Sequence, residues 1–115
     1  MLNGWIGVDF DGTLATYDVG TAPTLGEPIP QMVGRIQKWL SKGIAVRIVT
    51  ARASHPEFDT EQRTKMEEWC IRHIGVVLPI GCSKTYEMIE LWDDRAVQVE
   101  TNTGVVIGKS RMGWK

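Results

Sequence analysis

The sequence predicts a single α/β domain built around a mainly parallel β-sheet. Two amphipathic helical segments alternate with short apolar segments rich in β-branched residues, and this alternation is typical of parallel sheets whose strands are joined by helices. The chain has 115 residues, of which 43% are hydrophobic and 23% are charged. That length suits one domain, predicted over residues 1–115, and the composition suits a folded core rather than a disordered chain.

The first half of the chain carries two strand signals and one helix signal. Residues 4–10, GWIGVDF, form a short apolar run that predicts the first strand. Residues 29–42 predict a helix, because their apolar side chains recur with a period of about 3.6 residues. Those side chains belong to Ile29, Met32, Val33, Ile36, Trp39 and Leu40. Gly43 follows where a left-handed C-cap is expected, and residues 44–50, IAVRIVT, predict a buried central strand.

The second half predicts another helix and four short strands. The helix is expected from about Glu57 to His73, with acidic residues in its first turn, where negative charge favours the helix dipole. Residues 75–78 and 88–92 predict two further strands of the sheet. Two β-rich segments, 96–100 and 105–108, flank the turn sequence TNTG and predict a C-terminal β-hairpin.

Two pairs of acidic residues follow predicted strands. Asp9 and Asp11 come at the end of the first strand, and Asp93 and Asp94 come directly after the strand at 88–92. Because the carboxyl ends of parallel strands meet at one edge of a sheet, we expect both pairs at that edge. Close carboxylates repel unless they are protonated, paired or bound to a metal, and a hard cation such as Mg2+ prefers oxygen ligands. The sequence therefore predicts a Mg2+ site held by these four residues.

The segments that carry these acids resemble the motifs of the haloacid dehalogenase superfamily of aspartate-nucleophile phosphatases and phosphotransferases. DFDGT, residues 9–13, is similar to the first motif in every position, and IVTAR, residues 48–52, is similar to the second. ELWDDRAV, residues 90–97, is similar to the acidic fourth motif, and Lys84 in GCSKTYE is the candidate for the lysine of the third. The resemblance covers about residues 4–99. It implies a Rossmann-like sheet flanked by helices.

The resemblance implies a catalytic role for four residues. Asp9 would attack phosphorus and form an aspartyl-phosphate. Asp11 would protonate the leaving alcohol and later deprotonate the attacking water. Thr50 would hydrogen-bond a phosphoryl oxygen, and Lys84 would offset the negative charge of the transition state.

The resemblance also implies Mg2+ as the cofactor, with Asp93 and Asp94 among its ligands, and a phosphorylated substrate. The residues implied in substrate binding are Thr50, Ala51, Arg52 and Lys84. Lys84 lies in the segment 79–87, which joins two strands expected on opposite sides of the first strand. Lys42 and Lys109 are the alternatives to it.

The chain has no room for the cap domains that select substrates in this superfamily. Residues 13–28 predict a flap or loop in place of a cap, and residues 109–115 predict a basic tail. We therefore expect a minimal, capless member with an open site. Such a site accepts a phosphate on a small molecule or on the accessible end of a macromolecule, or it is covered by a second subunit.

The function expected from these features is Mg2+-dependent hydrolysis of a phosphomonoester. A phosphotransferase of the same superfamily and a non-catalytic phosphate-binding or regulatory module stay open as alternatives. The formal net charge of −1 gives no general attraction to nucleic acid or to an anionic membrane. We expect no membrane partner, while a nucleic-acid substrate and a homo-oligomer stay open. The N-terminus lacks the features of a signal peptide, so we expect a cytoplasmic protein.

Overall fold

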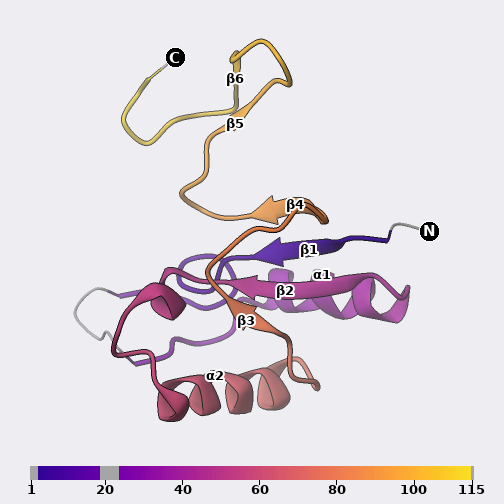
Figure 1. Ribbon diagram of the computed structural model, residues 1–115, viewed down its shortest axis with the longest axis vertical. Coiled ribbons are helices and arrows are strands. Elements are labelled where there is room, and N and C mark those ends of the chain that lie inside the picture. Colours follow the sequence, from indigo (N-terminus) through magenta and orange to yellow (C-terminus); the bar gives the residue numbers. More distant parts are fainter. Residues whose placement is uncertain (1–2, 19–23, 115) are drawn as a thin grey trace.

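The computed structural model describes residues 3–18 and 24–114. Part of the flap predicted over residues 13–28, and both ends of the predicted domain, therefore lie outside the described residues. Four parallel strands form the main sheet in the order β3-β2-β1-β4 (Figure 1). The strands are β1 (Trp5–Val8), β2 (Ala45–Val49), β3 (Ile80–Gly81) and β4 (Met88–Trp92). The prediction of an α/β fold with a mainly parallel sheet is confirmed.

Two helices, α1 (Pro30–Ser41) and α2 (Thr60–His73), pack their apolar side chains into one core. Successive residues of a strand point to opposite faces of the sheet. In β2, Val46 and Ile48 are buried in this core, whereas Ala45 and Arg47 on the other face are exposed. The core residues that the helices supply are Met32, Ile36, Met66, Trp69 and Cys70. Both helices therefore cover the same face of the sheet.

The first helix lies where its apolar periodicity predicted it. It begins at Pro30, a position where the missing N–H of proline costs no helical hydrogen bond. It is followed by Gly43, whose φ is 78°, as predicted for a left-handed C-cap. The amide of Ile44 then donates to the carbonyl of Trp39 at 3.0 Å, and this bond turns the chain into β2.

The second helix begins later than the sequence predicted. The carboxylate of Asp59 accepts a hydrogen bond from the amide of Gln62 at 3.0 Å, so Asp59 is the N-cap rather than a residue of the first turn. Helical hydrogen bonding therefore starts at Thr60 and not at Glu57. Among the helices of the described residues, none is long and apolar enough to cross a membrane.

The third strand does not lie at residues 75–78, where the sequence predicted it. Gly75 instead completes the end of α2, because it has a φ of 106° and its amide donates to the carbonyl of Cys70 at 3.0 Å. Pairing with β2 begins only at Pro79, whose carbonyl accepts a hydrogen bond from the amide of Ile48 at 2.8 Å. The β-branched residues before Pro79 thus have no strand to pair with.

Residues 82–87 join β3 to β4, which lie at opposite edges of the sheet as expected. At about 3.3 Å per extended residue, this segment can cross the sheet but cannot contain a full helix. It crosses the face that the helices leave uncovered, where the indole N–H of the buried Trp5 donates to Thr85 Oγ1 at 3.0 Å. Lys84 lies in this segment and is exposed to solvent.

The C-terminal strands β5 (Gln98–Val99) and β6 (Val106–Ile107) pair antiparallel with each other. They form a separate two-stranded sheet and add no strand to the main one. Figure 1 shows this pair standing apart from the main sheet, beyond β4. The carboxyl edge of the main sheet is therefore formed by the loops after β1, β2, β3 and β4.

Candidate functional site

The loop after β1 delivers the first acidic pair to the carboxyl edge of the sheet. Asp9 follows β1 directly, and its amide donates to the carbonyl of Trp92 at 2.8 Å, so its backbone stays aligned with the end of β4. The chain then turns, with the amide of Ala15 donating back to the carbonyl of Phe10 at 2.9 Å. Gly12 takes a φ of 89° in this turn, a left-handed conformation that glycine adopts without steric cost.

Three of the four predicted metal ligands lie together. Asp9, Asp93 and Asp94, here called the acidic triad, each offer one carboxylate oxygen, and these oxygens all lie within 4.8 Å of one another. Asp9 comes from the end of β1 and the other two from the end of β4, and the parallel pairing of these strands makes the two loops neighbours. Binding of Mg2+ to the triad stays a prediction.

Thr13 connects the two acidic segments. Its hydroxyl oxygen lies 3.4 Å from Asp9 Oδ2 and 3.2 Å from Asp94 Oδ1, and it accepts a hydrogen bond from the amide of Asp94 at 3.0 Å. Because a threonine hydroxyl has one proton, it donates to one of the two carboxylates at a time. The other oxygen of Asp94 accepts a hydrogen bond from Arg111 at 3.0 Å. Asp94 is therefore held by neighbours on both oxygens.

The sequence predicted neither Thr13 nor Arg111 as a site residue. Thr13 carries a local signal, because it is the last residue of the DFDGT segment that delivers Asp9. Arg111 carries none, since it belongs to the predicted basic tail and lies 17 residues after Asp94. Arg111 lies beside the triad only because the chain folds back after β5 and β6.

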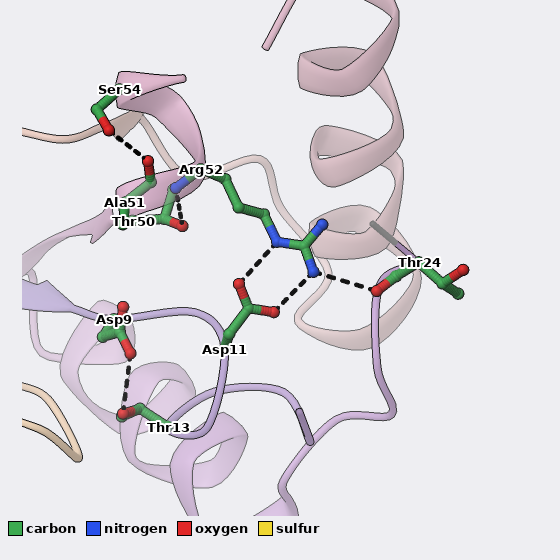
Figure 2. Close-up of polar contacts among 8 residues, drawn as sticks. All are labelled: Asp9, Asp11, Thr13, Thr24, Thr50, Ala51, Arg52 and Ser54. Atoms are coloured by element: carbon green, nitrogen blue, oxygen red, sulfur yellow. Dashed lines mark hydrogen bonds and ion pairs between the residues drawn. The ribbon is translucent and has the colours of Figure 1, made fainter. Parts of the chain in front are cut away.

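Asp11 does not join the acidic triad. Figure 2 shows its carboxylate facing Arg52, whose Nε and Nη2 donate to Oδ2 and Oδ1 at 2.7 and 2.8 Å. Arg52 Nη2 also donates to the carbonyl of Thr24 at 3.1 Å. The side chains of Arg52 and Asp11 are only 17% and 19% exposed, so water screens this bidentate pair weakly. A guanidinium thus engages both side-chain oxygens of Asp11, and ligation of a metal by this residue stays a prediction.

Crowding of carboxylates changes the titration of Asp9. Burial, followed by the charges of Asp93 and Asp94, raises the pKa of Asp9 from 3.8 to about 7. Without a cation, the triad is thus an unfavourable concentration of negative charge. A divalent cation between these oxygens would remove the repulsion, because its charge would be the largest in the site.

Thr50 ends β2 at the same edge of the sheet and is 1% exposed. Its amide donates to the carbonyl of Gly81 at 2.8 Å. Its hydroxyl accepts a hydrogen bond from the amide of Arg52 at 3.2 Å and so caps the short 3-10 helix η2 (Ala51–Ser54). This cap turns the chain so that the Arg52 side chain extends toward Asp11 (Figure 2).

A cavity of about 750 Å³ lies beside the acidic triad. Its wall comes from the loops after β1, β2, β3 and β4 and from the start of α2. The lining residues are Asp9, Asp11, Tyr17, Val49, Thr50, Ala51, Arg52, His55, Glu57, Phe58, Gln62, Cys82, Asp93 and Arg95. Three of the four predicted substrate-binding residues are on this wall, and the volume is in the range of small-molecule sites.

The lysines considered from the sequence are not on the described wall of this cavity. Lys84 is exposed in the segment that joins β3 to β4. Lys42 follows α1 and precedes β2, which places it at the amino edge of the sheet, opposite the triad. Lys109 is exposed in the C-terminal tail. The positive charge on the wall comes from arginines instead.

Substitution of Gly12 by alanine is expected to destabilise the protein by about 2 kcal/mol or more, since the left-handed φ alone costs about 1–2 kcal/mol for other residues. The added Cβ would also lie 2.6 Å from Asp94 Oδ2. Gly34→Ala is the matched control, because a Cβ at that position in α1 meets nothing within 4 Å. It should stabilise the helix by up to about 1 kcal/mol. Urea denaturation measures both, and equal effects would contradict the account of Gly12.

No protein-family model, curated protein or solved structure matches this chain. Membership of the haloacid dehalogenase superfamily therefore stays a prediction from the motifs, and the function is inferred from the geometry of the site.

Proposed function

We propose that the protein is a Mg2+-dependent phosphatase that hydrolyses a phosphomonoester through an aspartyl-phosphate on Asp9. The observation that carries the proposal is the position of Asp9. Its carboxylate lies with those of Asp93 and Asp94, and it lines the same cavity as Thr50. Asp9, Asp93 and Thr50 thus line one cavity, and this supports the proposal.

The acidic triad suits Mg2+ in ligand type and in spacing. Mg2+ binds oxygen at about 2.1 Å in an octahedron, which sets neighbouring ligand oxygens about 3–4 Å apart. The triad oxygens, within 4.8 Å of one another, need only a small contraction to reach this spacing. Thr13 and Arg111 already engage the oxygens of Asp94. We therefore expect Asp9 and Asp93 to bind directly. When bound, Mg2+ would polarise the phosphoryl group and offset the charge of the nucleophile.

Asp9 begins the reaction as the nucleophile. One of its carboxylate oxygens attacks phosphorus, and the bond between phosphorus and the leaving oxygen breaks as that oxygen takes a proton. Water then attacks the phosphorus of the aspartyl-phosphate, loses a proton, and releases inorganic phosphate and the Asp9 carboxylate. The hydroxyl of Thr50 accepts a hydrogen bond from the amide of Arg52 and keeps its own proton to donate to a phosphoryl oxygen.

Asp11 is the group that we assign to both proton transfers. It lines the cavity beside Asp9, gives a proton to the leaving alcohol and takes one back from water, so its protonation state is restored in each turnover. Because Arg52 engages both of its oxygens, Asp11 must release one of these hydrogen bonds and take up a proton from water before it can protonate the leaving alcohol.

A panel of phosphomonoesters tests the proposal, including nucleotides, sugar phosphates, a phosphopeptide and a phosphorylated oligonucleotide. We expect release of inorganic phosphate with Mg2+ and none with EDTA, because the cation offsets the charge that otherwise repels phosphate from Asp9. We also expect a covalent phosphoenzyme that hydroxylamine cleaves, as it cleaves acyl phosphates.

Two other results would each contradict the hydrolase. A phosphorylated alcohol as the main product, when acceptor alcohols are supplied, would indicate a phosphotransferase. Binding of phosphate without turnover or phosphoenzyme across the panel would indicate a non-catalytic phosphate-binding module.

A further inference from the structure

The arginines near the triad differ in whether a carboxylate already neutralises them. Arg52 is bound to Asp11 by two hydrogen bonds, and Arg111 is bound to Asp94. Arg95 lies on the wall of the cavity, and within residues 3–18 and 24–114 its guanidinium forms no hydrogen bond or ion pair. Its charge is therefore not neutralised by a carboxylate of the described residues.

The backbone places Arg95 beside the triad. The residue directly follows Asp94 in the chain, and its amide donates to Asp93 Oδ1 at 2.8 Å. This hydrogen bond closes a turn at the end of β4, of the kind that aspartate side chains form with the amide two residues on. The Arg95 side chain consequently starts at the rim of the cavity that Asp9 also lines.

When the charged groups around the cavity are paired, one positive side chain of the described residues has no carboxylate partner and can bind a phosphate. The three negative charges of the triad would balance Mg2+ and Arg111, and Asp11 balances Arg52. Arg95 and Glu57 are the charged groups that then remain on the described wall. Glu57 comes from the segment before α2, whereas Arg95 adjoins the triad in the chain.

We infer that Arg95 binds the phosphate group of the substrate and so supplies the positive charge that the family resemblance implied for Lys84. The inference rests on the proposed function, because it places the phosphate in front of Asp9. A guanidinium donates two parallel hydrogen bonds to two oxygens of one phosphate, a geometry that a lysine ammonium cannot reproduce. The ligand class is therefore a phosphate with at least two free oxygens, as in a phosphomonoester.

Binding of inorganic phosphate in the presence of Mg2+, measured by isothermal titration calorimetry, tests the inference before any substrate is known. Arg95→Gln is expected to weaken phosphate binding by about 10- to 100-fold, the usual size for a charge-assisted hydrogen-bonded contact. Arg95→Lys should weaken phosphate binding less, because lysine keeps the positive charge but cannot donate two parallel hydrogen bonds. Arg72→Gln is the matched control, since it removes an exposed arginine from the last turn of α2, and it should bind phosphate as the unmodified protein does. Thermal unfolding of each variant checks that it is folded.

The outcomes separate this inference from the proposed function. Unchanged phosphate affinity in Arg95→Gln would overturn the inference alone, whatever the turnover of the unmodified protein. Weaker binding in Lys84→Gln but not in Arg95→Gln would overturn it in favour of Lys84. Absence of phosphate binding in the unmodified protein would overturn the inference, while release of phosphate from the substrate panel decides the phosphatase separately. Binding that depends on Arg95, in a protein without turnover, would support the inference and contradict only the phosphatase.

Discussion

Replacement of Asp9 by asparagine is expected to lower phosphatase turnover by at least about 10³-fold and yet to stabilise the metal-free protein near neutral pH. An amide cannot act as the nucleophile, so no aspartyl-phosphate forms. The same change removes a half-buried carboxylate whose pKa is raised to about 7 by burial and by Asp93 and Asp94, and so relieves their repulsion. Because the two effects have opposite directions, loss of turnover in this variant cannot be attributed to unfolding.

Phosphate release with Mg2+ and thermal unfolding in EDTA at about pH 8 measure these two effects separately. Glu68→Gln is the matched control, because it removes an exposed carboxylate from α2, and neither quantity should change in it. Turnover that survives in Asp9→Asn would remove the nucleophile assignment. A lower unfolding temperature of Asp9→Asn in EDTA would contradict the electrostatic account of the triad.

The free energy of unfolding of the metal-free protein is expected to fall as the pH rises from 3.8 to about 7, the range over which Asp9 titrates differently in the unfolded and folded states. In this range the folded protein binds more protons than the unfolded chain, so rising pH favours unfolding. Asp9 is half-buried and partly screened by solvent, so we expect a loss of about 2 kcal/mol rather than the full value of the pKa shift. Urea denaturation in EDTA measures the loss, and subtraction of the Asp9→Asn values isolates the contribution of Asp9.

The same measurement with Mg2+ completes this prediction. Mg2+ binds the ionised carboxylates and competes with the proton on Asp9, so it should stabilise the protein more at about pH 8 than at about pH 5. Asp93→Asn should remove most of this gain, because it takes away a ligand from the triad. Equal stabilisation at both pH values, or an undiminished gain in Asp93→Asn, would contradict a metal site at the triad.

Sequence patterns predicted a helix or strand correctly where the contacts that form it lie within one segment of the chain. The apolar periodicity over residues 29–42 located α1, and Gly43 marked its end, because an amphipathic face and a left-handed cap belong to one segment. Val76 and Val77 have the residue type of a strand but are exposed. A strand forms only where the chain lies beside β2, and β2 pairs with Ile80 and Gly81 rather than with these two valines.

The sequence by itself determined that acidic residues end two strands of a parallel sheet, because residue type and turn chemistry along each segment are enough to place them there. It did not determine which arginine side chain forms an ion pair with each carboxylate. Arg52 reaches Asp11 across 41 residues of chain, and Arg111 reaches Asp94 across 17. Only the tertiary structure decided that Asp11 is paired while Arg95 stays available, because the attraction between charges depends on their distance in space and not on their separation along the chain.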